Sequence, residues 1–254
     1  MKKDLLATSI RAALEAGHDI MAIYDDPAAD FGIERKADNS PLTRADKAAH
    51  ARIMMFLEPT GIPVLSEEGA HLPYDVRCGW QRLWIVDPLD GTKEFIKRNG
   101  EFTVNIALIE NGEPVLGVIY VPVKKQLYYG IVGEGADKDE NGLKLTLPLD
   151  STDRPYTVVA SRSHLSPETA DFIDNLRREH PDLELVSSGS SLKICLVAEG
   201  KADIYPRHAP TMEWDTAAGD AIARAAGREI VDALTGEPLH YNKEDLHNPW
   251  FIVK

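Results

Sequence analysis

The beginning of the chain carries apolar residues at helical spacing. Within residues 1–24 they recur every three or four positions, which predicts an amphipathic helix whose apolar stripe faces the protein core. A helix lying on a membrane surface is the alternative that this pattern leaves open. The helical pattern returns after Thr43 and stops before Pro59, which predicts a second helix between them.

Short apolar blocks, which are typical of buried strands, come next. They lie at residues 62–66, 83–86, 103–110, 113–123 and 126–132. Asn111 and Gly112 separate two of these blocks, and this dipeptide strongly favours a β-hairpin. The polar, glycine-rich stretch 133–144 fits either an extension of that hairpin arrangement or a loop.

Strand and helix patterns alternate in the second part of the chain. Strands are expected at 156–160, 183–187 and 202–206, and helices after Ser166-Pro167, at 191–200 and at 212–227. Such alternation predicts an α/β arrangement that follows a more antiparallel α+β half. The polar segment 147–155 is the best boundary, which divides the chain into residues 1–150 and 151–254.

Composition and charge restrict the class of protein. The chain has 254 residues, 43% of them hydrophobic and 27% charged, as expected for a globular protein with a sizeable core. The net charge of −13 argues against a nucleic-acid polymer as partner, although a local cluster of Lys and Arg can still hold a small anion. Cys78 and Cys195 show neither zinc-site nor disulfide spacing.

No targeting segment and no apolar run long enough to span a membrane are visible. With the two isolated cysteines, this predicts a cytoplasmic protein without stable membrane insertion. If the first helix lay on a membrane surface instead, the protein would be peripheral at the inner face of the cell membrane.

Acidic residues follow two of the expected strands. Glu67 and Glu68 come after one, and Asp87 and Asp90 come after another. A hard divalent cation such as Mg²⁺ reconciles several carboxylates at neighbouring strand ends, and the absence of a His or Cys cluster argues against zinc. Read alone, the segment Asp87–Gly91 also fits an ordinary turn.

Several distant motifs together resemble the inositol monophosphatase superfamily. "WIVDPLDGT" (84–92), preceded by Glu67-Glu68 and followed by "EWDTAAGDA" (213–221), is similar to the signature segments of these magnesium-dependent, lithium-sensitive phosphatases. "NSPLTRAD", "GTKEF", "SRSH", "GSSLKICLVAEGKADIYPR" and "PTMEWDTAAGD" resemble its CysQ-type 3'(2'),5'-bisphosphate nucleotidase branch. One departure is His208-Ala209, where an aromatic-glycine pair is expected.

The resemblance implies a fold and a set of metal ligands. The fold is α+β, a layered αβαβα sandwich of the sugar phosphatase type. Side-chain ligands for two or three Mg²⁺ ions are implied at Glu67, Asp87, Asp90 and Asp215, with the backbone carbonyl of Leu89. An acid in the first turn of a helix is also favoured by the helix dipole, which would explain Asp215 without a metal.

Further residues are implied to act on the substrate. Asp46 and Thr92, together with Glu67, would position and deprotonate the attacking water, although Thr43 and Asp46 also form a capping-box pattern. In the second half, the nucleotide and its second phosphate would be held at His164, Ser190, Lys193 and Arg207. The complete implied substrate site comprises Glu67, Leu89, Asp90, Gly91, Thr92, His164, Ser190, Lys193, Arg207 and Asp215.

The implied activity is removal of the 3'-phosphate from adenosine 3',5'-bisphosphate, giving AMP and phosphate, which recycles a by-product of sulfur assimilation. Two alternatives stay open: a phosphatase for inositol phosphates or other sugar phosphates, and a metal-binding protein without turnover. The protein is expected to be a monomer or a homodimer.

Overall fold

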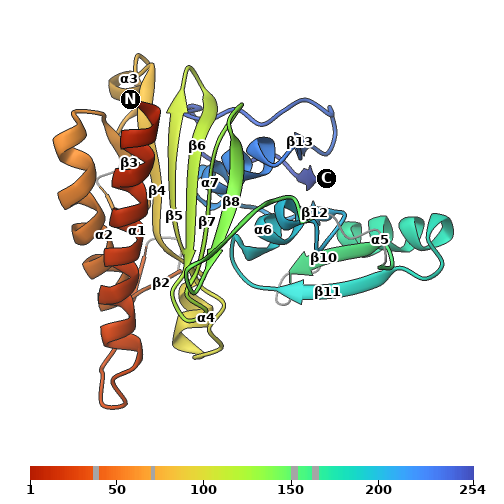
Figure 1. Ribbon diagram of the computed structural model, residues 1–254, viewed down its shortest axis with the longest axis horizontal. Coiled ribbons are helices and arrows are strands. Elements are labelled where there is room, and N and C mark those ends of the chain that lie inside the picture. The colour runs from red at the N-terminus through yellow and green to blue at the C-terminus, as the bar shows by residue number, and fades with distance from the viewer. Residues whose placement is uncertain (37–39, 70–71, 150–153, 162–165) are drawn as a thin grey trace.

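The computed structural model describes residues 1–36, 40–69, 72–149, 154–161 and 166–254. Five layers follow one another across the molecule (Figure 1). Helices α1 (Lys2–Tyr24) and α2 (Arg44–Leu57) form the first layer, and a seven-stranded sheet forms the second. Helices α6 (Leu192–Glu199) and α7 (Glu213–Ala225), then short strands, then α5 (Pro167–Glu179) complete the αβαβα sandwich that was expected.

The large sheet has the strand order β3-β4-β5-β6-β7-β8-β9. Its strands are β3 (Val64–Ser66), β4 (Arg82–Asp90), β5 (Thr103–Glu110), β6 (Glu113–Val121), β7 (Gln126–Ile131), β8 (Gly135–Glu140) and β9 (Leu143–Leu147). Strand β3 runs parallel to β4, whereas all later neighbours are antiparallel. Both acid-bearing strands, β3 and β4, therefore deliver their C-terminal ends to the same edge of the sheet.

The predicted hairpin at Asn111-Gly112 is confirmed. Both residues have positive φ, 53° and 81°, as a tight hairpin turn of this kind requires. The polar stretch 133–144 is also strand, because β8 and β9 continue the antiparallel order in a further hairpin.

The described part of the second half contains two smaller sheets. Strand β10 (Thr157–Ser161) is parallel to β11 (Glu184–Ser188), and β14 (Phe251–Val253) lies between β12 (Tyr205–Arg207) and β13 (Ile230–Asp232). The strand expected at 202–206 begins later than predicted, because its register is set by pairing of Tyr205 with Val253 at the C-terminus.

The shorter elements surround the acid-bearing strands. They are β1 (Glu34–Arg35), β2 (Pro41–Leu42), a 3₁₀ turn (Glu58–Thr60), α3 (Tyr74–Arg77) and α4 (Thr92–Ile96). The helix starts follow their sequence signals, since Thr43 caps α2 and Ser166 caps α5 through side-chain oxygens.

The apolar stripe of α1 faces the core. Ala12, Ala13, Ala16 and Ile20 are fully buried and belong to one apolar cluster with α2 and the near face of the sheet. This confirms the core-facing interpretation of the first helix, whose stripe is therefore not available to a membrane surface. No helix in the described part of the chain has the length and apolar character that a membrane crossing requires.

The opposite face of the sheet is covered by the C-terminal part of the chain. Helix α7 packs against β5 and β6 so closely that a Cβ on Gly117 would lie 2.2 Å from the carbonyl oxygen of Ala218. A second apolar cluster contains residues from both sides of position 150. The two predicted halves thus share a core, and α7 brings Asp215 to the edge where β4 ends.

Candidate active site

A β-bulge makes Asp87 and Asp90 converge. Side chains along a regular strand alternate between faces, so residues three positions apart would point to opposite sides. In this sheet Asp87 pairs with Asn105 and Asp90 pairs with Thr103, so β4 contains one residue more than β5 between these two pairs. The extra residue turns Asp90 to the side of Asp87. Pro88 fits this position, because a bulge tolerates the missing N–H donor.

Asp87, Asp90 and Asp215 form a compact acidic cluster. Each offers an oxygen, and the three oxygens lie within 4.8 Å of one another. Burial, followed by repulsion from Glu67, Asp90 and Asp215, raises the pKa of Asp87 well above its usual value. Burial, followed by repulsion from Asp90, raises the pKa of Asp215 to about 8. Charge is crowded here, so a cation between these groups would relieve the repulsion.

Glu67 lies beside this cluster and is paired with a lysine. Lys36 Nζ contacts Oε1 of Glu67 at 2.6 Å and also forms an ion pair with Glu68. Burial raises the pKa of Glu67, and the attraction of Lys36 opposes that change. The contact between the carboxyl groups of Glu67 and Asp87 joins Glu67 to the other acids.

Asp46 and Thr92 are in direct contact. Thr92 Oγ1 donates to Oδ1 of Asp46 at 3.1 Å, while the backbone N–H of Thr43 donates to Oδ2 at 2.7 Å. The predicted capping box is therefore present, and it leaves one oxygen of Asp46 for Thr92. Burial raises the pKa of Asp46. The Leu89 carbonyl oxygen lies 3.4 Å from Thr92 Oγ1, at the same edge.

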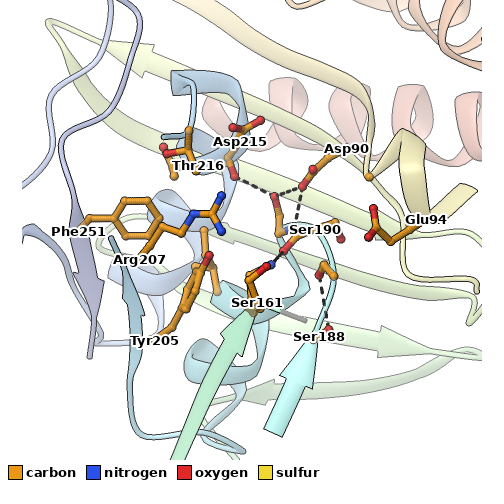
Figure 2. A pocket seen from close by; sticks show the side chains of 16 residues that line it. Asp90, Glu94, Ser161, Ser188, Ser190, Tyr205, Arg207, Asp215, Thr216 and Phe251 are labelled. Atoms are coloured by element: carbon orange, nitrogen blue, oxygen red, sulfur yellow. Dashed lines mark hydrogen bonds between the residues drawn. The ribbon is translucent and has the colours of Figure 1, made fainter. Parts of the chain in front are cut away.

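A cavity of about 140 Å³ extends from the acids into the second half (Figure 2). Its walls include Asp90, Asp215, Ser190, Lys193 and Arg207, so the structure brings together predicted residues far apart in sequence. Figure 2 shows Arg207 reaching into this cavity, with Glu94 on the opposite side.

Cationic and polar groups in this cavity have unused donors. Lys193 is 5% exposed, donates to the carbonyl oxygen of Ser190 at 2.6 Å and lies 5.3 Å from the ring centre of Tyr205. Burial lowers the pKa of Lys193 to about 8. Ser190 Oγ and Arg207 Nε are buried without a hydrogen-bond partner in the described part of the chain. A ligand with several acceptor oxygens would satisfy them.

A wider cavity of about 370 Å³ meets the first at Asp90, Gly91 and Asp215. It is lined by Glu67 and Thr92, two of the three residues predicted to be catalytic. Gly91 has a φ of 93°, and a Cβ there would lie 3.0 Å from the carbonyl oxygen of Glu101. Glycine therefore permits the sharp turn between β4 and α4. The predicted nucleotide contact His164 lies outside the described residues.

The chain matches the family model of the inositol monophosphatase family over residues 1–249. The chain belongs to this family. The 3'(2'),5'-bisphosphate nucleotidase CysQ of Salmonella typhimurium is 51% identical over 252 residues, which cover 98% of this chain and 99% of the relative. The same-named protein of Haemophilus influenzae is 34% identical, covering 100% of this chain and 93% of the relative.

Solved structures agree with this family membership. The crystal structure of CysQ from Bacteroides thetaiotaomicron has a TM-score of 0.92 at 59% identity, covering 99% of this chain and 97% of the other. The extragenic suppressor protein suhB from Bartonella henselae is 24% identical and has a TM-score of 0.77, covering 98% and 93%, which shows a shared fold.

Inositol monophosphatase family members are metal-dependent, and the residues of this chain fit that property. The acidic cluster of Asp87, Asp90 and Asp215 presents only carboxylate oxygens, the donors that hard divalent cations prefer. Among the described residues, none forms an ion pair with these three groups, whereas Glu67 is paired with Lys36. Cys78 and Cys195 are free thiols, as expected.

His208, the departure from the family pattern, packs away from the acids. Its Nδ1 lies 3.1 Å from Thr169 Oγ1, and its ring contacts Phe172 and, edge-on, Trp250. Burial lowers the pKa of His208. The side chain thus joins α5 to the C-terminal segment at Trp250.

Three residues of the site were not predicted from the sequence. Lys36 binds Glu67, whereas Asn105 and Ser191 bind Asp90. Lys36 precedes the motif at 39–46, Asn105 lies in an apolar strand, and Ser191 lies between two predicted residues. Of the three, only Asn105 had a signal in the sequence. A polar residue inside an otherwise apolar strand needs a buried hydrogen-bond partner.

Proposed function

We propose that this protein is a Mg²⁺-dependent phosphatase that removes the 3'-phosphate of adenosine 3',5'-bisphosphate and releases AMP and phosphate. The observation that carries the proposal is the meeting of two cavities at Asp90 and Asp215, one lined by acids and Thr92, the other by Lys193 and Arg207. Such a site suits a substrate with one phosphate to react and another to be held. Relatives at 51% identity carry the name 3'(2'),5'-bisphosphate nucleotidase.

Mg²⁺ would be held by Asp87, Asp90, Asp215 and Glu67, with the Leu89 carbonyl as a further oxygen ligand. When bound, two or three such ions supply charge neutralisation at the reacting phosphate and lower the pKa of water. Mg²⁺ is proposed over Zn²⁺ because every side-chain donor is a carboxylate.

Asp46 and Thr92 would act on the attacking water. The Thr92 hydroxyl donates its proton to Asp46 Oδ1, so its oxygen is free to accept a hydrogen bond from the water. Thr43 holds the other oxygen of Asp46 and fixes the carboxyl group in place. Asp46 can then take up the proton that leaves through Thr92 as the water attacks phosphorus.

Lys193, Arg207 and Ser190 would hold the phosphate that does not react. An anion near Lys193 offsets the cost of burying its ammonium group, which the lowered pKa reflects. Arg207 can donate two hydrogen bonds to a phosphate in a fork, and Ser190 Oγ adds another donor. AMP would not react further, because it carries its only phosphate at this anchor. The nucleoside contact at His164 stays a prediction.

Inositol 1-phosphate is the second candidate substrate, since this chain belongs to the inositol monophosphatase family. It has no second phosphate for Lys193 and Arg207. The test is phosphate release from adenosine 3',5'-bisphosphate and from inositol 1-phosphate, each with Mg²⁺ and with excess chelator. We expect a much higher kcat/KM for the bisphosphate and no turnover under chelation. Equal or higher kcat/KM for inositol 1-phosphate would overturn the substrate assignment.

The cytoplasmic location, the monomeric or homodimeric state and the division at residue 150 remain predictions. The buried apolar stripe of α1 and the free thiols Cys78 and Cys195 support a cytoplasmic location without membrane association. A role in recycling a by-product of sulfur assimilation follows from the proposed substrate.

A further inference from the structure

One oxygen of Asp90 is fully used by hydrogen bonds within the protein. The backbone N–H of Ser191 donates to Oδ2 of Asp90 at 2.7 Å, and the Ser191 hydroxyl oxygen lies 2.6 Å from the same atom. Asn105 Nδ2 approaches it at 3.4 Å. Because a carboxylate oxygen has two lone pairs, these donors occupy Oδ2. Oδ1 of Asp90 is then the atom available to a cation.

Asn105 has a defined orientation in this network. Its Oδ1 accepts a hydrogen bond from Thr103 Oγ1 at 2.9 Å, and its Nδ2 donates to Ser191 Oγ at 2.8 Å. The opposite orientation of the amide would place its oxygen against the carboxylate of Asp90, two acceptors facing each other. Thr103, Asn105 and Ser191 are all buried. The hydrogen bonds among these three side chains therefore lie largely out of contact with bulk solvent.

Ser191 also reaches the second acidic residue. Its hydroxyl oxygen also lies 2.8 Å from the backbone carbonyl oxygen of Asp215, but the shorter contact of 2.6 Å and the negative charge of the carboxylate favour Asp90 as the acceptor of its single proton. Ser191 directly follows Ser190, whose carbonyl accepts from Lys193. Ser191 thus connects Asp90, the start of α7 and the turn proposed to hold the non-reacting phosphate.

We propose that Ser191 and Asn105 are positioning residues that reserve Oδ1 of Asp90 for the metal ion. Neither side chain needs to touch the metal or the substrate. Their hydrogen bonds fix the rotation of the Asp90 carboxyl group and hold it at a set distance from Asp215 and from the Ser190 turn. Partners of this kind orient metal ligands in many sites, and their loss typically weakens metal binding about 10- to 100-fold. The inference rests on the proposed function in taking Asp90 as a ligand of the metal ion.

The first experiment measures Mg²⁺ binding without substrate. Ser191→Ala and Asn105→Ala are titrated with Mg²⁺, and binding is followed by calorimetry and by the rise in Tm. Ser9→Ala is the matched control, because it also removes a fully buried serine hydroxyl that donates to a backbone carbonyl, but in α1. We expect both site variants to bind Mg²⁺ about 10- to 100-fold more weakly and Ser9→Ala to bind it like the unaltered protein.

The double variant separates positioning from general destabilisation. If Ser191 and Asn105 act through the same oxygen of Asp90, the double variant loses less free energy of Mg²⁺ binding than the two single variants lose in sum. A merely structural role would lower the Tm of the metal-free protein but leave Mg²⁺ affinity unchanged, as we expect for Ser9→Ala. Folded site variants with unaltered Mg²⁺ affinity would overturn the inference.

The unaltered protein gives an independent test should a variant not fold. In a crystal structure soaked with Mn²⁺, the ion should contact Oδ1 of Asp90, while Oδ2 keeps its bonds to Ser191. An ion on Oδ2, or on both oxygens, would overturn the inference. Because these experiments do not measure turnover, their result is separate from that of the substrate comparison. A protein that binds Mg²⁺ as described but ignores the bisphosphate would contradict the proposed function alone.

Discussion

Thr92 Oγ1 donates a hydrogen bond of 3.1 Å to Oδ1 of Asp46, and this contact joins the first residue of α4 to the first turn of α2. The same carboxyl group caps α2 through its other oxygen. Asp46 therefore caps α2 with one oxygen and contacts Thr92 with the other, so its structural role can be tested separately from its proposed catalytic role.

Thr92→Val removes the hydroxyl while nearly preserving side-chain shape. We expect kcat to fall about 100- to 10,000-fold, because the water loses the group that orients it and carries its proton to Asp46. Mg²⁺ affinity and Tm should change little. Ser166→Ala provides the comparison, since it removes a helix cap far from the acids and should cost about 1 kcal/mol of stability without loss of turnover. Near-normal kcat in Thr92→Val would exclude this role.

Asp90→Asn should abolish turnover without unfolding the protein. The amide oxygen can replace Oδ2 in the bonds from Ser191, and the amide nitrogen then faces the metal position, where it cannot act as a ligand. Loss of one charge beside Asp87 and Asp215 relieves repulsion, so the Tm of the metal-free protein should hold or rise. The rise in Tm caused by Mg²⁺ should disappear. Normal activity would remove Asp90 from the ligands.

Chelation of divalent metal should stop turnover and lower the Tm, because a ligand that binds only the folded state stabilises it. Lithium in the millimolar range should suppress the Mg²⁺-supported activity, as is typical of the inositol monophosphatase family, to which the chain belongs. Steady-state phosphate release and thermal unfolding measure both effects. Turnover that persists after exhaustive chelation would exclude the metal-dependent mechanism.

Asp220 gives the fold a pH dependence away from the acidic cluster. Burial raises its pKa to about 6, although Arg224 opposes this. A carboxyl that binds its proton more tightly in the folded protein stabilises the fold at low pH, and this contribution is lost as the pH rises from about 4 to about 6. The Tm of the unaltered protein should therefore fall relative to that of Asp220→Asn over this range. A constant difference in Tm between the two proteins over this range would show that Asp220 does not lose its proton there.

Much of the fold follows from local signals in the sequence. Thr43 and Ser166 cap helices as expected, and the Asn111-Gly112 turn has the predicted conformation, because each of these depends on neighbouring residues alone. The acids at the ends of β3 and β4 also come together, since parallel strands end at one edge of the sheet.

The remaining features depend on contacts between distant segments. The bulge that aligns Asp87 with Asp90 is defined only by pairing with β5. Lys36 meets Glu67, and Ser191 meets Asp90, across separations that no periodic pattern encodes. The late start of β12 likewise reflects its pairing with the C-terminal strand β14. Tertiary pairing, rather than local preference, decides these positions.

The central claim is that the cavity beyond the acids anchors a second phosphate through Lys193. The most direct test is kcat/KM for adenosine 3',5'-bisphosphate and inositol 1-phosphate in the unaltered protein, in Lys193→Met and in Lys201→Met. Lys201 is the matched control, because it is half exposed near the other end of α6 and pairs with Glu199. Removing a buried charged partner costs 2 kcal/mol or more, which is a loss of about 30-fold. We predict a loss of at least this size for Lys193→Met with the bisphosphate, little change with inositol 1-phosphate, and little change with either substrate in Lys201→Met. Equal losses on both substrates in Lys193→Met would contradict the account.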